Sequence, residues 1–257
     1  MKHFIALLTR FIPRTTLQRV AHLGFKSVSW VYSGSRFEDP IDGSTYRKML
    51  PYGRVRSRPN ALAPRTLSLE RHRALWLYFQ RETDFFTSKA KMLHLAPEYC
   101  FIKRFRGMEN IEYVSGDLDS PWADYHFDVH DIPFEDNSFD MLMANHLMEH
   151  VDDDSKVLAE FFRVMKPDAW GILQVPINWK NPNTQEDRSI TDPRERERLY
   201  WQSDHVRLYG HGDYPKLLES AGFEVEVVDM EKLLGKDQYT RYCLGDERWV
   251  YAVKKPV

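Results

Sequence analysis

The sequence has little cysteine, no long apolar run and almost no net charge. Its two cysteines, Cys100 and Cys243, exclude a disulfide framework and are too few for a structural zinc site built from thiolates. No apolar run is long enough to span a bilayer, and the short FIALL run near the start is interrupted by Arg10, unlike a signal peptide. The formal net charge of −2 gives the whole molecule no attraction for nucleic acid. We therefore expect a protein of the reducing cytoplasm without a nucleic-acid partner.

Charge is unevenly distributed along the chain. Residues 1–36 contain lysines and arginines but no acid, and apolar residues are interleaved among them. This pattern predicts an amphipathic helix, packed either on the protein's own domain or on an anionic surface. The second alternative allows a weak membrane-surface contact through residues 1–36.

Glycine is missing from a turn where many α/β proteins have it. An apolar strand at residues 92–95 ends in Ala96-Pro97-Glu98 and runs toward a helix. Glycines at such a turn let the backbone approach a cofactor. The turn alone leaves three alternatives: a cofactor site of different construction, a decayed site, or a strand end without a ligand.

From residue 91 onward, short apolar strands alternate with helices, which predicts a parallel sheet. The expected strands cover residues 92–95, 111–114, 126–129, 139–144, 171–175, 223–228 and 249–253. Expected helices cover residues 68–82, residues 152–165 with an end at Lys166-Pro167, and a segment from about Tyr214 to Gly222. The polar insertion at residues 177–214 has a size that usually serves a ligand.

Polar residues follow these strands at the edge where an open α/β sheet binds ligands. Glu98 follows the first strand, and Asp117 follows the second at the usual position of a ribose-binding acid. Asp131 precedes the strand that ends at Asn145-His146. One acid after a strand is more often a solvated turn, but the order and spacing of the set favour a cofactor site.

Residues 91–176 resemble class I S-adenosylmethionine-dependent methyltransferases of the branch called methyltransferase type 11. The resemblance rests on DIPFEDNSFDMLMANHLMEHV followed by EFFRVMKPDAWGILQVP. It implies an α/β, Rossmann-like sheet of seven strands, the last antiparallel, with helices on both faces and S-adenosylmethionine across the first four strand ends. HLAPE, SLERHR, DHVRLYG and AGF are similar to the motifs of one subgroup. The turn without glycine is therefore expected to be a subgroup variant that still binds the cofactor.

The resemblance also implies which residues bind the cofactor: His94, Ala96, Glu98, Asp117, Asp131, Ile132, Asn145 and His146. Asp117 matches the acid that holds the ribose hydroxyls, and Asp131 the acid that meets the adenine amino group, with Ile132 beside the ring. Asn145 and His146 match the strand end beneath the methionine part. Glu149 and His150 belong to the family's L-E-H signature and are interpreted mainly as structural.

Members of the subgroup often carry two C-P-x-C knuckles ahead of SLERHR, a pattern typical of a zinc ribbon. The corresponding text here is Asp39 to Asp42 and Ala63 to Thr66, where every candidate thiolate is missing. No metal is therefore expected. Residues 1–66 are predicted to form a basic helix and a degenerate ribbon-like region, followed by the methyltransferase domain over residues 67–257.

In-line methyl transfer requires mainly proximity and orientation from the protein, and a base when the acceptor is an alcohol or an amine. The candidate bases are His146, Asp204, His205 and His211. We interpret His205 as the acceptor-site base, oriented by Asp204 or Arg207, with His146 in a cofactor or catalytic role. The alternative is a loop ion pair between Asp204 and Arg207 without a catalytic role.

The expected function is methyl transfer from S-adenosylmethionine to a small molecule or to a glycan- or lipid-linked acceptor. A non-catalytic S-adenosylmethionine-binding or scaffold protein with the same fold is the alternative. A nicotinamide-dependent oxidoreductase is disfavoured, because no turn offers a glycine-rich grip on pyrophosphate.

Overall fold

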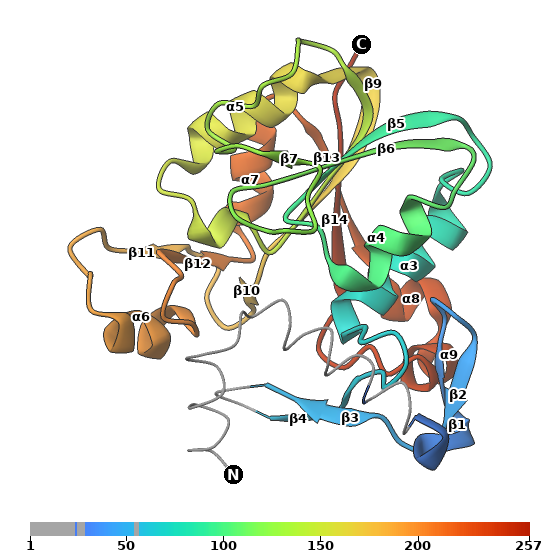
Figure 1. Ribbon diagram of the computed structural model, residues 1–257. Coiled ribbons are helices and arrows are strands. Elements are labelled where there is room, and N and C mark those ends of the chain that lie inside the picture. The colour runs from blue at the N-terminus through green and yellow to red at the C-terminus, as the bar shows by residue number, and fades with distance from the viewer. Residues whose placement is uncertain (1–23, 25–28, 54–56) are drawn as a thin grey trace. The chain divides into compact units, whose positions relative to one another are not determined.

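The computed structural model describes residue 24, residues 29–53 and residues 57–257 (Figure 1). Most of the helix expected within residues 1–36 lies outside the described residues. The chain divides into two compact units: the part up to Arg81 with Met230–Arg248, and Glu82–Asp229 with Trp249–Val257. Within the described part of the chain, no helix is long and apolar enough to cross a membrane.

The second unit is built on a seven-stranded sheet with the order β13-β14-β9-β8-β5-β6-β7. The parallel strands are β5 (Ala90–Leu95), β6 (Ile111–Asp117), β7 (Tyr125–His126), β8 (Phe139–Asn145) and β9 (Met165–Gln174). The strand β14 (Trp249–Lys254) pairs antiparallel with β9 and with β13 (Glu224–Asp229). The predicted strands are confirmed except at residues 126–129, where β7 covers only Tyr125–His126, and the antiparallel last strand is confirmed.

Helices cover both faces of this sheet, as expected (Figure 1). They are α4 (Tyr99–Phe105) on one face, and α5 (Asp154–Val164) and α7 (Asp213–Ser220) on the other. Successive side chains of β5 point to opposite faces of the sheet and so contact the helices on both faces. Leu93 and Leu95 join the core with α5 and α7, whereas His94 packs against Phe101 and Phe105 of α4.

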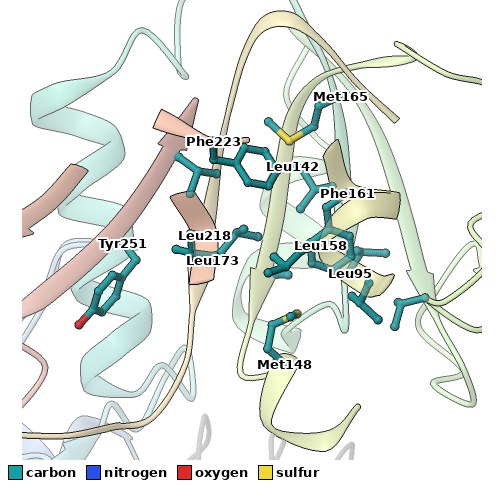
Figure 2. Close-up of a cluster of buried hydrophobic side chains, with 14 of the residues drawn as sticks. Leu95, Leu142, Met148, Leu158, Phe161, Met165, Leu173, Leu218, Phe223 and Tyr251 are labelled. Carbon is teal, nitrogen blue, oxygen red and sulfur yellow. The ribbon is translucent and has the colours of Figure 1, made fainter. Parts of the chain in front are cut away.

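The core beneath α5 and α7 is drawn in Figure 2. Val157, Leu158, Phe161 and Val164 line one side of α5 and are fully buried. Burying each such side chain contributes about 1.5–3 kcal/mol relative to exposure. Asp153 caps the helix by accepting a hydrogen bond from the Lys156 N–H at 3.0 Å.

The predicted end of α5 at Lys166-Pro167 is wrong. The helix ends at Val164, and Met165 already has extended backbone and begins β9. Met165 is fully buried in the sheet core, so its apolar side chain suits a strand as well as the helix face. Pro167 also disfavours helical backbone at Lys166.

The insertion between β9 and α7 has regular structure of its own. Its strands form a small sheet in the order β10-β12-β11. They are β10 (Ile177–Asn178), β11 (Gln185–Glu186) and β12 (Arg207–Gly210), with α6 (Pro193–Tyr200) between the last two. The buried Arg207 guanidinium donates to Glu186 and to the carbonyls of Met148, Val151 and Asp152. These bonds hold the insertion against the loop that follows β8.

The first unit contains two antiparallel hairpins, the arrangement expected of a ribbon-like region. They are β1 (Ser33–Asp39) with β2 (Ser44–Tyr46), and β3 (Leu50–Tyr52) with β4 (Arg58–Leu62). The helical elements are η1 (Ser29–Tyr32), α3 (Glu70–Glu82), α8 (Met230–Leu234) and α9 (Lys236–Arg241).

The division into units differs from the boundary predicted at residue 66. Arg73 of α3 donates hydrogen bonds to the carbonyls of Ala61 and Ser68 and also to those of Tyr242 and Cys243. One buried guanidinium therefore joins the hairpin region to a segment near the C-terminus. Contacts between segments so distant in sequence could not be read from composition.

Candidate functional site

The chain leaves both β5 and β8 through a residue with left-handed backbone. Ala96, which follows β5, has a φ of 49°, and its N–H donates to the Gly116 carbonyl at 2.9 Å. His146, which follows β8, has a φ of 58°. Glycine is the usual residue in this conformation, because a Cβ atom makes it costly. The turn after β5 therefore keeps a glycine-like shape without a glycine, and strain of this kind clusters at functional sites.

Three of the residues expected to bind the cofactor meet at this edge of the sheet. Glu98 lies 2.6 Å from His94 Nε2, and its other carboxylate oxygen accepts a hydrogen bond from the Asn145 side-chain amide. The Asn145 Oδ1 atom and the His146 Nε2 atom are buried and have no hydrogen-bond partner among the described residues. Buried polar atoms are nearly always paired, so these two atoms suit a polar ligand.

The other expected cofactor residues lie at the same edge or in the core. Asp117 ends β6, and its Oδ1 accepts hydrogen bonds from the N–H groups of Asp119 and Ser120. Asp131 is exposed to solvent. Ile132 is 2% exposed and belongs to the hydrophobic core, with its N–H bonded to Glu160.

A second polar group, the histidine–carboxylate cluster, consists of His146, Glu149, His150 and His205. The first three belong to the end of β8 and to η2 (Met148–His150), and His205 comes from the loop between α6 and β12. His146 Nδ1 lies 3.1 Å from Glu149 Oε1, and His205 Nε2 lies 3.9 Å from the same oxygen. The His150 and His205 rings meet edge to face with their centroids 4.8 Å apart.

The centre of this cluster is buried and lacks hydrogen bonds. The side chains of Glu149 and His205 are each 1% exposed. Both Glu149 oxygens and the Nε2 atoms of His146 and His205 have no hydrogen-bond partner in the described chain. The 3.1 Å contact between His146 Nδ1 and Glu149 Oε1 therefore lacks hydrogen-bond geometry. His205 Nδ1 lies 2.8 Å from the Tyr200 carbonyl, which can only accept, so Nδ1 carries the proton and Nε2 presents a lone pair.

Burial and neighbouring charges set the ionisation of the cluster. Burial is the largest single influence on the pKa of Glu149 and raises it. His146 and His150 together lower this pKa by more, so it lies below its ordinary value. Burial is the largest influence on the pKa of His205 and lowers it, although Glu149 acts in the opposite direction. At neutral pH the cluster therefore contains an ionised carboxylate beside a neutral imidazole.

The predicted orientation of His205 by Asp204 or Arg207 is wrong. The Asp204 side chain is 67% exposed, and its Oδ2 lies 3.6 Å from His150 Nδ1. Arg207 pairs with Glu186, so the alternative of an Asp204–Arg207 ion pair is also wrong. The Tyr200 carbonyl orients His205 instead. His211 stacks on Trp179 and lies outside the cluster.

Two members of the cluster, Glu149 and His150, were not among the predicted site residues. Their spacing from His146, written His-x-x-Glu-His, brings positions three and four residues apart onto one side of a helical turn. This spacing is the signal that could have identified them. Their contact with His205 depends on the fold of the insertion, which the spacing does not reveal.

Residues 89–173 match the family model described as a methyltransferase domain. A 40-residue stretch is 48% identical to a ubiquinone/menaquinone biosynthesis C-methyltransferase, UbiE, of Desulfotalea psychrophila. That match spans 16% of this chain and only 16% of the relative.

Two solved structures share the fold. The [4+2]-cyclase SpnF has a TM-score of 0.50 at 13% identity, over 93% of this chain and 97% of that one. An S-adenosylmethionine-dependent methyltransferase from Mesorhizobium loti has a TM-score of 0.50 at 11% identity, over 71% of this chain and 98% of that one. At these identities the likeness concerns the fold alone.

Proposed function

Because residues 89–173 match the methyltransferase domain model and contribute β5 to β9 of the seven-stranded sheet, we propose that the protein transfers a methyl group from S-adenosylmethionine to an acceptor. One observation carries the proposal. The family segment contains the ends of β5, β6 and β8, where Glu98, Asp117 and Asn145 are placed. The alternative function is cofactor binding without transfer, on the same fold.

The polar atoms at this edge have the chemistry that the cofactor requires. S-adenosylmethionine carries an ammonium and a sulfonium, both cationic, and no pyrophosphate, so a turn without glycine does not count against it. Glu98 and the unpaired Asn145 Oδ1 would hold the ammonium, beside His94, Ala96 and His146. When bound, the cofactor supplies an electrophilic methyl group.

The nucleoside part is assigned to the residues at the ends of β6 and β7. Asp117 would hold the ribose hydroxyls, and Asp131 with Ile132 would meet the adenine ring. Asp131 is exposed and accessible to a ligand, whereas Ile132 lies in the core and has little surface to offer the adenine ring. Asp117 is therefore the strongest of the three assignments.

Acceptor activation is assigned to the histidine–carboxylate cluster. His205 presents an Nε2 lone pair beside Glu149, and His146 places a second unpaired nitrogen next to the methionine end of the cofactor site. Asp204 contacts His150 and is a positioning residue rather than a catalytic one. The acceptor is proposed to be a small molecule or a glycan- or lipid-linked compound, and not nucleic acid, because the net charge is only −2. A cytoplasmic location and a weak membrane-surface contact through residues 1–36 are also proposed.

Isothermal titration with S-adenosylmethionine and with its demethylated product tests the cofactor assignment. Asp117→Ala should weaken binding by roughly 1–3 kcal/mol, because a charge-assisted hydrogen bond to the ribose is lost. Asp119→Ala is the matched control, since this exposed acid lies two residues further on and should leave affinity unchanged. Failure of the unmodified protein to bind either compound would contradict the proposal. Binding without turnover on any acceptor tested would favour the alternative.

A further inference from the structure

Glu149 is a buried carboxylate whose negative charge is not stabilised by hydrogen bonds from the described residues. Its carboxylate is 1% exposed, and neither oxygen has a hydrogen-bond partner among the described residues. Buried charges in proteins are normally paired through hydrogen bonds or coordinate metal ions. The nearest groups are histidines, and one of them, His205, presents a lone pair rather than a proton toward the carboxylate. The His205 lone pair and the Glu149 carboxylate are both electron-pair donors, so a cation between them would be attracted to both.

The donor atoms are close enough to share one ion. One ligand atom each from Glu149, His150 and His205 can be chosen so that all lie within 4.8 Å of one another. Around a tetrahedral zinc ion with bonds of 2.0–2.2 Å, ligand atoms lie about 3.4 Å apart. Small side-chain rotations would close that gap. Across residues 24, 29–53 and 57–257, no other group of three or more such side chains has this proximity.

The surroundings of both imidazoles suit metal ligands. His205 Nδ1 donates to the Tyr200 carbonyl at 2.8 Å, and His150 Nδ1 lies 3.3 Å from the Asp204 carbonyl. Histidines that bind metals commonly donate their other ring N–H to a carbonyl or carboxylate, which fixes the tautomer and the ring orientation. Here the same arrangement leaves His205 Nε2 without a hydrogen-bond partner among the described residues.

We propose that Glu149, His150 and His205 bind one divalent transition-metal ion, with Zn²⁺ as the best match to two imidazoles and a carboxylate. Three protein ligands leave a coordination position open, as in catalytic zinc sites. These ligands differ from the thiolate positions at residues 39–42 and 63–66, from which no metal was expected. His146 lies beside the ion site and faces Glu149.

The position of the ion suggests what it does, and this step alone rests on the proposed function. The cluster directly follows Asn145, the strand end assigned to the cofactor's methionine part. In this arrangement His205 would activate the acceptor through the ion and not as a base: the open position would bind an acceptor oxygen, whose proton would pass to solvent as the ion lowers its pKa. The oxygen then forms the bond to the methyl carbon while the carbon–sulfur bond breaks and its electron pair remains on sulfur. The acceptor class is therefore an alcohol, enol or phenol rather than an amine.

The test uses the untagged full chain, stripped with a chelator and titrated with ZnCl₂ in a calorimeter, with elemental analysis of the reloaded protein. We expect about one zinc per chain. Glu149→Gln and His205→Gln should each weaken zinc binding by at least about 100-fold, because each removes a ligand. His126→Gln is the control, since this exposed histidine of the same unit lies outside the cluster and should leave affinity unchanged.

Circular dichroism of the metal-free variants shows that they are folded, and visible absorption of bound Co²⁺ reports the ligand set independently. No zinc uptake by the unmodified protein, or uptake unchanged in both ligand variants, overturns the proposal. Titration with S-adenosylmethionine is performed separately. Zinc binding without cofactor binding would overturn the proposed function but not the metal site, whereas cofactor binding without zinc uptake would overturn the metal site alone.

Discussion

Asp39 and Glu149 are both buried carboxylates, one in each unit of the chain, but their surroundings differ. Asp39 accepts hydrogen bonds from the Thr66 hydroxyl, from the Ser68 hydroxyl at 3.1 Å and from the Ile41 N–H at 3.0 Å. Glu149 accepts none from the described residues. The hydrogen bonds of Asp39 explain its burial within the fold, whereas Glu149 is the carboxylate for which we propose a bound ion.

The difference is sharper because Asp39 and Thr66 stand where the resembled subgroup has zinc-binding cysteines. At these positions the Thr66 hydroxyl donates a hydrogen bond directly to the Asp39 carboxylate. Within the first unit, these hydrogen bonds join Asp39 to the segment at Thr66 and Ser68. The second unit places histidines around Glu149, a carboxylate that accepts no hydrogen bond from the described residues.

The largest effect is expected from His205→Ala. Turnover should fall by roughly 10²–10⁴-fold, the range for losing a group that activates the acceptor. Cofactor affinity should be nearly unchanged, because His205 is not among the residues assigned to the cofactor. Single-turnover kinetics with a saturating cofactor and titration calorimetry measure the two quantities. Full activity would leave His205 as a structural residue and move the assignment to His146, and His211→Ala is the control for a histidine outside the cluster.

Asp39→Ala should act on stability instead of activity. The change leaves the Thr66 and Ser68 hydroxyls and the Ile41 N–H without their acceptor, which costs roughly 1–3 kcal/mol of the free energy of unfolding. Urea unfolding followed by circular dichroism measures this loss. Asp42→Ala is the control, because Asp42 bonds to Ser44 near the same hairpin but is less buried. A variant as stable as the parent would show that the hydrogen-bonded group contributes nothing to the first unit.

The pH dependence of stability should also identify Asp39. Burial raises the pKa of this carboxyl above 3.8, by more than Arg73 and the hydrogen bond from Thr66 lower it. Between the unfolded and folded pKa values, the folded state binds the proton more strongly, so this contribution is fully present below 3.8 and is lost as the pH rises through the folded pKa. Asp39→Asn should remove this loss. Parallel stability curves of the two proteins across acidic pH would contradict the assignment.

The sheet was predictable from sequence because each strand is a short apolar run bounded by polar residues. The same rule misplaced the end of α5, because Met165 is apolar and suits either element. At the site, the order of Glu98, Asp117 and Asn145 along the chain predicted their common edge. The partners of His205 were not predictable, because its nearest neighbours in sequence, Asp204 and Arg207, are not its partners. Which atoms remain unpaired depends on three-dimensional packing.

The smallest effect is expected at Ala96, a residue of the second unit whose backbone is strained by its left-handed conformation. Ala96→Gly should raise the free energy of unfolding by at most about 1 kcal/mol, because glycine accepts a φ of 49° without steric cost but also gains freedom in the unfolded chain. Cofactor affinity should be unchanged, since the turn already has the glycine-like shape. Ala96→Val is the opposing variant, because a β-branched side chain is poorly tolerated in left-handed backbone. Thermal unfolding and titration calorimetry of both variants measure the effects. Loss of cofactor binding in Ala96→Gly would mean that the alanine methyl group itself contacts the ligand, and that the turn is more than a substitute for glycine.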